Sequence, residues 1–276
     1  MASESTGSDR IKREAEFHDR IASDIDIKDI LVDESFTAPT AVENRFILSE
    51  FGDDIRGKTI LDYGCGSAEG GIYLAKLGAR VVGVDVSEKM LESAEALAKQ
   101  HGVSIETRMV TGENIPAADA EFDLIYGNGV LHHAPLSSAM PELARVLKPE
   151  GKGCFIEPLP YNPVINVYRR MADKVRTVDE KPLHFRDLDR FRDHFEEVRH
   201  REFWLTTLSV FLKFYLLDRV HPNEERYWKK IYKDTQSFDW MFNPLRRLDD
   251  TLLSTFPALG RMCWNTVLTV AKPIRR

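Results

Sequence analysis

The chain has 276 residues, a length that suits one elaborated α/β domain and is short for two independent domains. Its formal charge is −6 and its isoelectric point is near 5.8, so no broad basic surface for nucleic acid is expected. Three widely spaced cysteines, a polar start and no long apolar run predict a soluble, cytoplasmic protein without a disulfide framework.

Two helices are expected at the start of the chain. Apolar residues recur at helical spacing from about residue 9 to residue 30, with charged residues between them. A second helical segment covers about residues 41–51, and Gly52 ends it. These helices belong to residues 1–56, which we separate from the main domain over residues 57–276.

The pattern then changes to strands that alternate with helices. Strand-like runs are expected at residues 59–63, 80–84, 103–107, 122–126 and 153–157, with a sixth at 195–203 and a seventh at 262–270. This alternation predicts a doubly wound α/β fold, in which helices cover both faces of a mostly parallel sheet. The carboxyl ends of such strands share one edge, where a site is expected.

A ligand-binding turn is predicted where the first strand ends. Asp62, Gly64 and Gly66 stand where the strand hands over to a helix, so the backbone can bend sharply and a ligand can approach it. A dinucleotide fingerprint would have a third glycine at the position that Glu69 occupies, where a pyrophosphate would be repelled. A cationic ligand suits these acids better. The second strand ends in Asp85, at the spacing from which a carboxylate reaches ribose hydroxyls.

Four ordered motifs carry a resemblance to a known superfamily. They lie at residues 61–66 (LDYGCG), 84–90 (VDVSEKM), 122–133 (FDLIY followed by VLHH) and 145–151 (RVLKPEG). Together they resemble class I S-adenosylmethionine-dependent methyltransferases, and within them the small-molecule and quinone-methyltransferase-like branch. The resemblance covers roughly residues 57–157. It implies a seven-stranded Rossmann-like methyltransferase fold, S-adenosyl-L-methionine as cofactor, and an N-terminal helical lid; a helix simply docked on the core is the alternative to a lid.

The resemblance also implies a set of cofactor-binding residues. They are Asp62, Gly64, Gly66, Asp85, Val86, Thr111, Gly112, Glu113 and Asn128. Asp62 is expected near the methionine amino end, Asp85 at the ribose hydroxyls, the turn at Gly112 beside the adenine, and the backbone near Asn128 at the amino group. Two positions depart from the usual methyltransferase pattern. Ala68 replaces the third glycine of the methyltransferase motif, and Thr111 stands where an acid is common.

Histidines after the fourth strand are the candidates for acid–base chemistry. A base is needed only if the acceptor must lose a proton, as a hydroxyl must, and His132 is the preferred candidate. His133, Glu157 as an orienting or substrate-binding carboxylate, and His18 on the first helix complete the catalytic candidates. A purely structural role for the paired histidines remains open. Adjacent histidines rarely ligate one ion, so no metal is expected.

Helical insertions at about residues 159–195 and 205–260 are expected to cover the substrate. Residues 203–242 hold eleven aromatic residues in forty positions, and these rings must be buried against something. The predicted function is methyl transfer to a small apolar or aromatic acceptor, preferably at oxygen. The alternatives are C- or O-methylation of a quinone precursor or lipid-like acceptor at a membrane surface, touched by residues 203–217, and a non-catalytic cofactor-binding or homodimerising scaffold.

Overall fold

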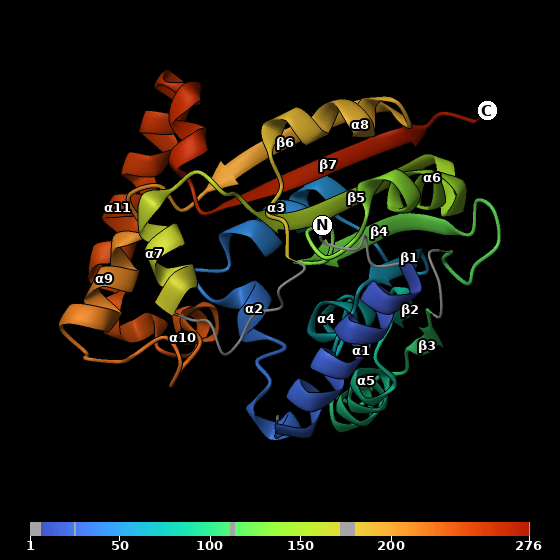
Figure 1. Ribbon diagram of the computed structural model, residues 1–276, viewed down its shortest axis with the longest axis horizontal. Helices are drawn as coiled ribbons and strands as arrows, with labels where there is room; N and C mark the ends of the chain where they lie inside the picture. Colours follow the sequence, from blue (N-terminus) through green and yellow to red (C-terminus); the bar gives the residue numbers. More distant parts are fainter. Residues whose placement is uncertain (1–6, 25, 111–113, 172–179, 276) are drawn as a thin grey trace, which may run out of the picture.

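The computed structural model describes residues 7–24, 26–110, 114–171 and 180–275, and its strands form one seven-stranded sheet (Figure 1). The strand order is β3-β2-β1-β4-β5-β7-β6. The strands are β1 (Thr59–Tyr63), β2 (Arg80–Asp85), β3 (Glu106–Met109), β4 (Phe122–Asn128), β5 (Leu147–Pro158), β6 (Phe195–Phe203) and β7 (Asn265–Pro273). Strand β7 is antiparallel to both of its neighbours, whereas the other pairs are parallel. The predicted doubly wound, mostly parallel sheet is confirmed.

Helices surround this sheet. They are α1 (Gly7–Asp24), α2 (Glu34–Thr37), α3 (Val42–Phe51), α4 (Glu69–Lys76), α5 (Glu88–Gln100), α6 (Leu136–Val146), α7 (Pro163–Met171), α8 (Leu188–Arg192), α9 (Ser209–Leu216), α10 (Tyr227–Lys233) and α11 (Thr235–Thr255). Short 3₁₀ helices lie at Ile27–Asp29, Phe185–Asp187 and Pro257–Met262. No helix within the described residues is both long enough and apolar enough to cross a membrane.

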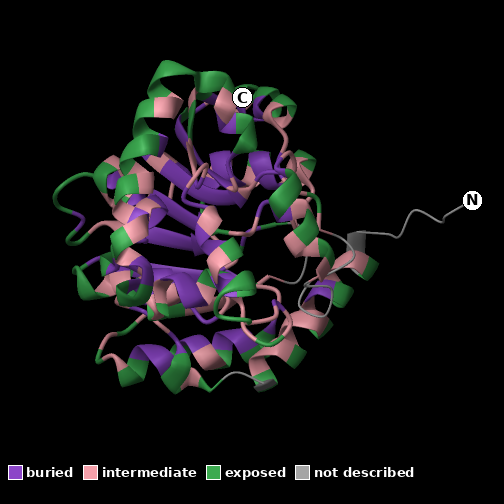
Figure 2. Ribbon diagram, turned by 90° about the vertical axis from the view of Figure 1, so that its left-hand side faces the viewer, coloured by how far each residue is buried: buried purple, intermediate pink, exposed green. Residues whose placement is uncertain are grey.

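Each face of the sheet has its own hydrophobic core, because successive side chains of a strand point to opposite faces. On one face Leu61, Ile125 and Phe155 pack with residues of α6 and α8. On the other face Ile60 and Leu124 pack with residues of α3 and α4. The central strands are therefore buried between exposed outer layers (Figure 2). This packing leaves the edge at the carboxyl ends of the strands as the place where a site can form.

Several predicted boundaries move, each for a local reason. The first helix ends at Asp24 instead of continuing to residue 30, because the Asp26 carboxylate accepts the Lys28 N–H at 3.0 Å and starts a separate 3₁₀ turn. Strand β3 begins at Glu106 instead of 103, because the Val103 N–H still bonds to Ala98 O at 3.1 Å and closes α5. Strand β7 begins three residues late, after the 3₁₀ helix Pro257–Met262.

The aromatic insertion between β6 and β7 forms a core of its own. It gathers α9, α10 and α11 at one end of the sheet, with α7 beside them (Figure 1). Its buried rings are Trp204, Phe211, Phe214, Tyr227, Phe238 and Phe242. The Asp249 carboxylate on α11 accepts backbone N–H bonds from Leu205, Thr206 and Thr207 at 2.7–3.2 Å, which fixes α11 to the end of β6. The rings are thus buried mainly against one another.

Candidate active site

A cavity of about 520 Å³ lies at the carboxyl ends of the central strands. Its wall includes these candidates from the sequence: Asp62, Gly64, Gly66, Asp85, Val86, Asn128, His132, His133 and His18. Glu157 does not line the cavity and lies behind His132, whereas Thr111, Gly112 and Glu113 lie outside the described residues. The structure therefore brings together side chains from β1, β2, β4 and α1 that are scattered in the sequence.

The turn after β1 exposes bare backbone to the cavity. Gly64 and Gly66 have φ angles of +66° and +52°, a left-handed conformation that favours glycine. A Cβ atom at Gly64 would come within 2.2 Å of Val130 Cγ2, so the loop after β4 packs directly on this turn. A Cβ at Gly66 would meet nothing within 4 Å. Gly66 thus leaves space in which a ligand can approach the main chain.

Asp85, at the end of β2, holds this turn in place. Its Oδ2 accepts the N–H of Gly66 at 2.8 Å and its Oδ1 accepts the N–H of Ser87 at 2.9 Å. The Ser87 hydroxyl in turn accepts the N–H of Met90 at the start of α5 and lies 2.6 Å from Asp19 Oδ1 on α1. Each carboxylate oxygen of Asp85 has a second lone pair available for a ligand hydroxyl. The expected ribose contact stays a prediction.

Three acids give this end of the cavity a negative field. Asp62 is only 2% exposed, and its Oδ2 accepts the N–H of Gly71 at 3.0 Å. Burial raises the pKa of Asp62 to about 7, and the charges of Glu69 and Asp85 add to the shift, despite the hydrogen bond from Gly71. A buried group of like charges is stabilised by a cation. This end of the cavity therefore favours a positively charged ligand over a phosphate.

Glu157 organises the loop that follows β4. Its side chain is fully buried, its Oε1 accepts the N–H groups of Val130 and Leu131 at 3.0 and 2.7 Å, and its Oε2 accepts the N–H of His132 at 3.2 Å. The same Oε2 lies 2.8 Å from His132 Nδ1. Because a carboxylate accepts, this contact favours the tautomer with the proton on Nδ1. In that tautomer the lone pair of the His132 ring lies on Nε2.

Glu14 is a site residue that the sequence analysis missed. It is 5% exposed, and its Oε2 lies 3.2 Å from His133 Nδ1 and 3.7 Å from His18 Nε2. Burial lowers the pKa of His133, but the hydrogen bond and charge of Glu14 outweigh burial and raise it. Burial lowers the pKa of His18, against the opposing charge of Asp85. The i,i+4 spacing of Glu14 and His18 was a usable signal that they share a face of α1.

The histidine cluster also meets a geometric condition for metal binding. The ligand atoms of Glu14, His18 and His133 lie within 4.8 Å of one another, as do those of His132, His133 and Glu180. In the first group, the contacts of Glu14 with both histidines already pair the carboxylate with imidazole nitrogens. A metal ion is therefore not required to explain this cluster.

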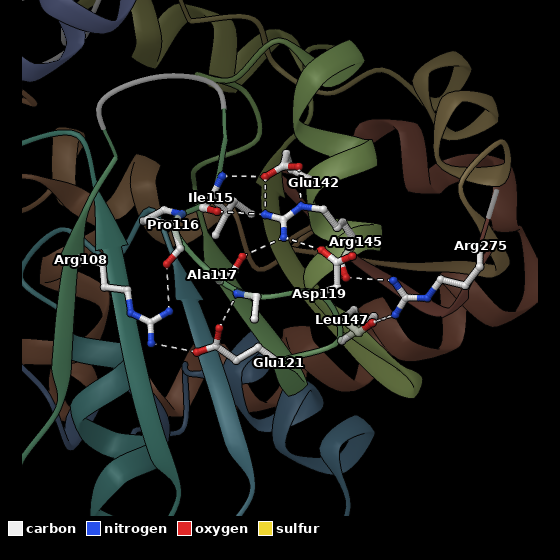
Figure 3. A network of polar contacts seen from close by, with 11 residues as sticks. Arg108, Ile115, Pro116, Ala117, Asp119, Glu121, Glu142, Arg145, Leu147 and Arg275 are labelled. Atoms are coloured by element: carbon white, nitrogen blue, oxygen red, sulfur yellow. Dashed lines mark hydrogen bonds and ion pairs between the residues drawn. The ribbon is translucent and has the colours of Figure 1, made fainter.

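The segment after β3 is braced from α6 (Figure 3). Arg145 donates to the carbonyls of Ile115 and Ala117 at 3.0 and 2.8 Å, and Glu142 Oε2 accepts the Ile115 N–H at 2.8 Å. From β3, Arg108 donates to Pro116 O at 2.9 Å. Ile115 belongs to the cavity wall, so this network fixes the wall beside the segment in which the adenine contacts were predicted.

The insertion contributes a further part of the wall. Arg226, Trp228, Lys229 and Tyr232, in or next to α10, all line the cavity. The sequence analysis expected the insertions to cover the substrate but singled out none of these side chains. The gathering of basic and aromatic residues within positions 226–232 was the available signal.

Comparison with known proteins indicates the kind of domain that carries these motifs. A family model described as a methyltransferase domain matches residues 61–155. The ubiquinone biosynthesis O-methyltransferase of Rhizobium johnstonii is 37% identical over 98 residues, which are 35% of this chain and 40% of the relative. The ribosomal protein L11 methyltransferase of Photobacterium profundum is 33% identical over 102 residues, 37% of this chain and 34% of the relative. The chain thus spans about two fifths or less of the length of these curated relatives.

A solved structure extends the likeness in fold to almost the whole chain. Phosphoethanolamine N-methyltransferase 2 of Haemonchus contortus, in complex with S-adenosylhomocysteine, superposes with a TM-score of 0.59 at 17% identity. It covers 94% of this chain and 60% of that structure's chain. At this identity the likeness shows the fold alone. Residues 61–155 therefore match a methyltransferase domain, and the fold agrees with the one expected from the resemblance to the class I S-adenosylmethionine-dependent methyltransferase superfamily.

The residues of the cavity fit the cofactor of that superfamily. Gly66 leaves open space beside the backbone of the turn, as close approach of a ligand requires. The buried acids around Asp62 suit a sulfonium and an amino group, both of which are cationic. The residues that would hold S-adenosylmethionine are therefore the turn at Gly64 and Gly66, with Asp62 and Asp85 at its two sides.

Proposed function

We propose that this protein transfers a methyl group from S-adenosylmethionine to a hydroxyl oxygen of a small, apolar or aromatic acceptor. The observation that carries the proposal is the contact of 2.8 Å between His132 Nδ1 and Glu157, in a loop that packs against the glycine turn of the same cavity. The relatives with matching domains act on different acceptors by their names, so they support methyl transfer and leave the acceptor open.

The residues of the chain have separate tasks in this proposal. The cofactor supplies an electrophilic methyl group, and the protein's main contribution is to hold the acceptor oxygen in line with it. His132 Nε2 takes the proton of the acceptor hydroxyl. Glu157 keeps the ring in the required tautomer and stabilises the imidazolium that forms. The three backbone N–H bonds to Glu157 fix that carboxylate in turn.

In this proposal α1 is a lid over the cavity. Arg10, Ile11, Phe17, His18 and Ile21 of α1 line the cavity wall. The helix is attached to both rims, through Glu14 to His133 after β4 and through Asp19 to Ser87 after β2. A closed lid excludes water and strengthens the electrostatic contacts inside the site. The insertion adds a further part of the wall with α10.

The substitution His132→Ala tests the proposed base. We expect turnover with hydroxylated aromatic acceptors to fall by ~100-fold or more, while affinity for S-adenosylhomocysteine stays the same. Formation of S-adenosylhomocysteine measures turnover, and calorimetry measures affinity. His101→Ala at the end of α5, outside the cavity wall, is the control. Full activity of a folded His132→Ala protein would assign this residue to structure. Binding of S-adenosylmethionine without turnover on any acceptor pool would favour the non-catalytic scaffold.

A second candidate acceptor is a quinone precursor or lipid-like molecule taken from a membrane surface. The specific observation is the exposed apolar end of α9, where Leu216 and Leu217 are 64% and 75% exposed and Leu212 and Tyr215 lie nearby in the sequence. Such a surface could touch an interface. Sedimentation with neutral and anionic vesicles is the test, with the Leu216→Ser, Leu217→Ser double variant as control. Absence of sedimentation with both vesicle types contradicts this candidate.

A further inference from the structure

The insertion places two positively charged side chains in the wall of the cavity. Arg226 directly precedes α10 and Lys229 lies in its first turn, and both are partly buried. Trp228 and Tyr232, from the same segment, also line the cavity. This corner therefore combines cationic groups with aromatic surface.

Within the part of the chain that the structure describes, neither cation has a carboxylate partner, although Lys229 Nζ lies 5.4 Å from the ring centroid of Trp228. Arg226 and Lys229 form no side-chain hydrogen bond and no ion pair there, whereas the neighbouring Lys230 is held by Glu225 at 3.1 Å and by Asp234. Lys213 on α9 is likewise paired with Asp218 at 2.8 Å. The insertion thus satisfies its half-buried and buried lysines outside the cavity wall with nearby carboxylates. It leaves the two cations of the wall with donors available.

The acids near Arg226 and Lys229 do not form hydrogen bonds with them. The charge of Glu69, which also lines the cavity, acts on both cations, and Asp29 acts on Lys229, but neither acid reaches a hydrogen bond with them. Burial lowers the pKa of Arg226 and of Lys229, since partial removal from water penalises both charges. Buried charges are normally paired or hydrogen-bonded. An anion entering the cavity would supply the missing acceptor atoms.

Arg226 shares the cavity wall with His18 of α1. Its charge acts on His18, which contacts Glu14 in the cluster with His133. We propose that Arg226 and Lys229 bind a carboxylate or phosphate group of the methyl acceptor, while Trp228 and Tyr232 pack against its apolar or aromatic body. This inference rests on the proposed function and narrows it to acidic acceptors. The competing source of the same chemistry is the carboxylate of the cofactor's amino-acid end. Glu69, whose charge acts on both cations, follows the glycine turn at which the cofactor is expected to bind.

Calorimetry with matched small probes tests the proposal. Protein loaded with S-adenosylhomocysteine is titrated with 4-hydroxybenzoate and phenyl phosphate, and with neutral 4-hydroxybenzyl alcohol. We expect at least one anion to bind ~10-fold or more tightly than the alcohol, as a charge-assisted hydrogen bond implies. Arg226→Gln and Lys229→Gln should each remove most of this preference. Lys233→Gln, on the exposed end of the same helix, should leave it unchanged.

Separate titrations with S-adenosylhomocysteine distinguish the two sources of the anion. The proposal expects unchanged affinity for S-adenosylhomocysteine in both variants. It is overturned if that affinity falls ~10-fold while the preference among the probes persists, because the cations then serve the cofactor. It is also overturned if the native protein shows no preference, including when no probe binds. Failure of the native protein to bind S-adenosylhomocysteine would instead refute the proposed function, and the anion preference would still be measurable without it.

Discussion

The two sides of the cavity are built in different ways. The side at β1 and β2 comes from turns that directly follow strands, and Asp85 joins these turns through the N–H groups of Gly66 and Ser87. The other side joins distant parts of the chain, since Glu14 of α1 meets His133 after β4 and Arg226 enters from the insertion. The first side is fixed by the strand–turn–helix geometry of the fold. The second side depends on tertiary contacts, so it is where members of one fold can differ in their acceptors.

Glu157 is the residue on which the second side depends most, and Glu157→Ala should have the largest effect. The change leaves three buried or half-buried backbone N–H groups and a histidine ring without their acceptor. We expect the free energy of unfolding to fall by about 3 kcal/mol or more. Urea denaturation measures it. Glu157→Gln, which keeps one carbonyl oxygen, should recover part of the loss.

A small effect of Glu157→Ala on stability would contradict the contrast between the two sides of the cavity. If stability changes by less than about 1 kcal/mol, the loop after β4 is held by the packing of Val130 on Gly64 instead of by the carboxylate. The second side of the cavity would then be as much a product of local strand-end geometry as the first.

The same contrast explains what the sequence could predict. Residues 59–63 and 195–203 were predicted as strands with the observed limits, because their patterns are local and turn residues or short helices bound them. Asp62, Gly64 and Asp85 could be placed at one edge because parallel strands align their carboxyl ends. Glu14 and Arg226 could not be placed. A helical pattern shows which residues share a face, but only tertiary packing decides what that face meets.

On the side at β1 and β2, Asp85→Ala tests whether Asp85 binds the cofactor or only supports the turn. If the free lone pairs of this carboxylate accept the ribose hydroxyls, affinity for S-adenosylhomocysteine should fall by about 1.5 to 3 kcal/mol. Calorimetry measures the change. Asp123→Ala is a matched control, because the Asp123 carboxylate also accepts a backbone N–H, from Thr59 at 2.8 Å, but at the start of the strands. Equal affinities of the native and Asp85→Ala proteins would show that Asp85 only supports the turn.

The smallest expected effect is a proton released when the cofactor binds. The pKa of Asp62 in the free protein is about 7, above its value of about 3.9 in an unfolded chain, so the folded protein binds the extra proton and loses this part of its stability as the pH rises towards 7. A cation beside the carboxylate lowers its pKa again. Binding of S-adenosylmethionine at pH 7 should therefore release up to about half a proton, since the group is half titrated there.

Calorimetry in buffers of different ionisation enthalpy measures this release, and two variants assign it to one side of the cavity. Asp62→Asn should abolish the release, because the titrating group is gone. Glu14→Gln should leave it unchanged, since Glu14 governs the titration of His133 on the other side. If the release survives in Asp62→Asn and disappears in Glu14→Gln, the proton comes from the histidine cluster. The contact between Glu14 of α1 and His133 would then respond to cofactor binding, and the two sides would act as one unit.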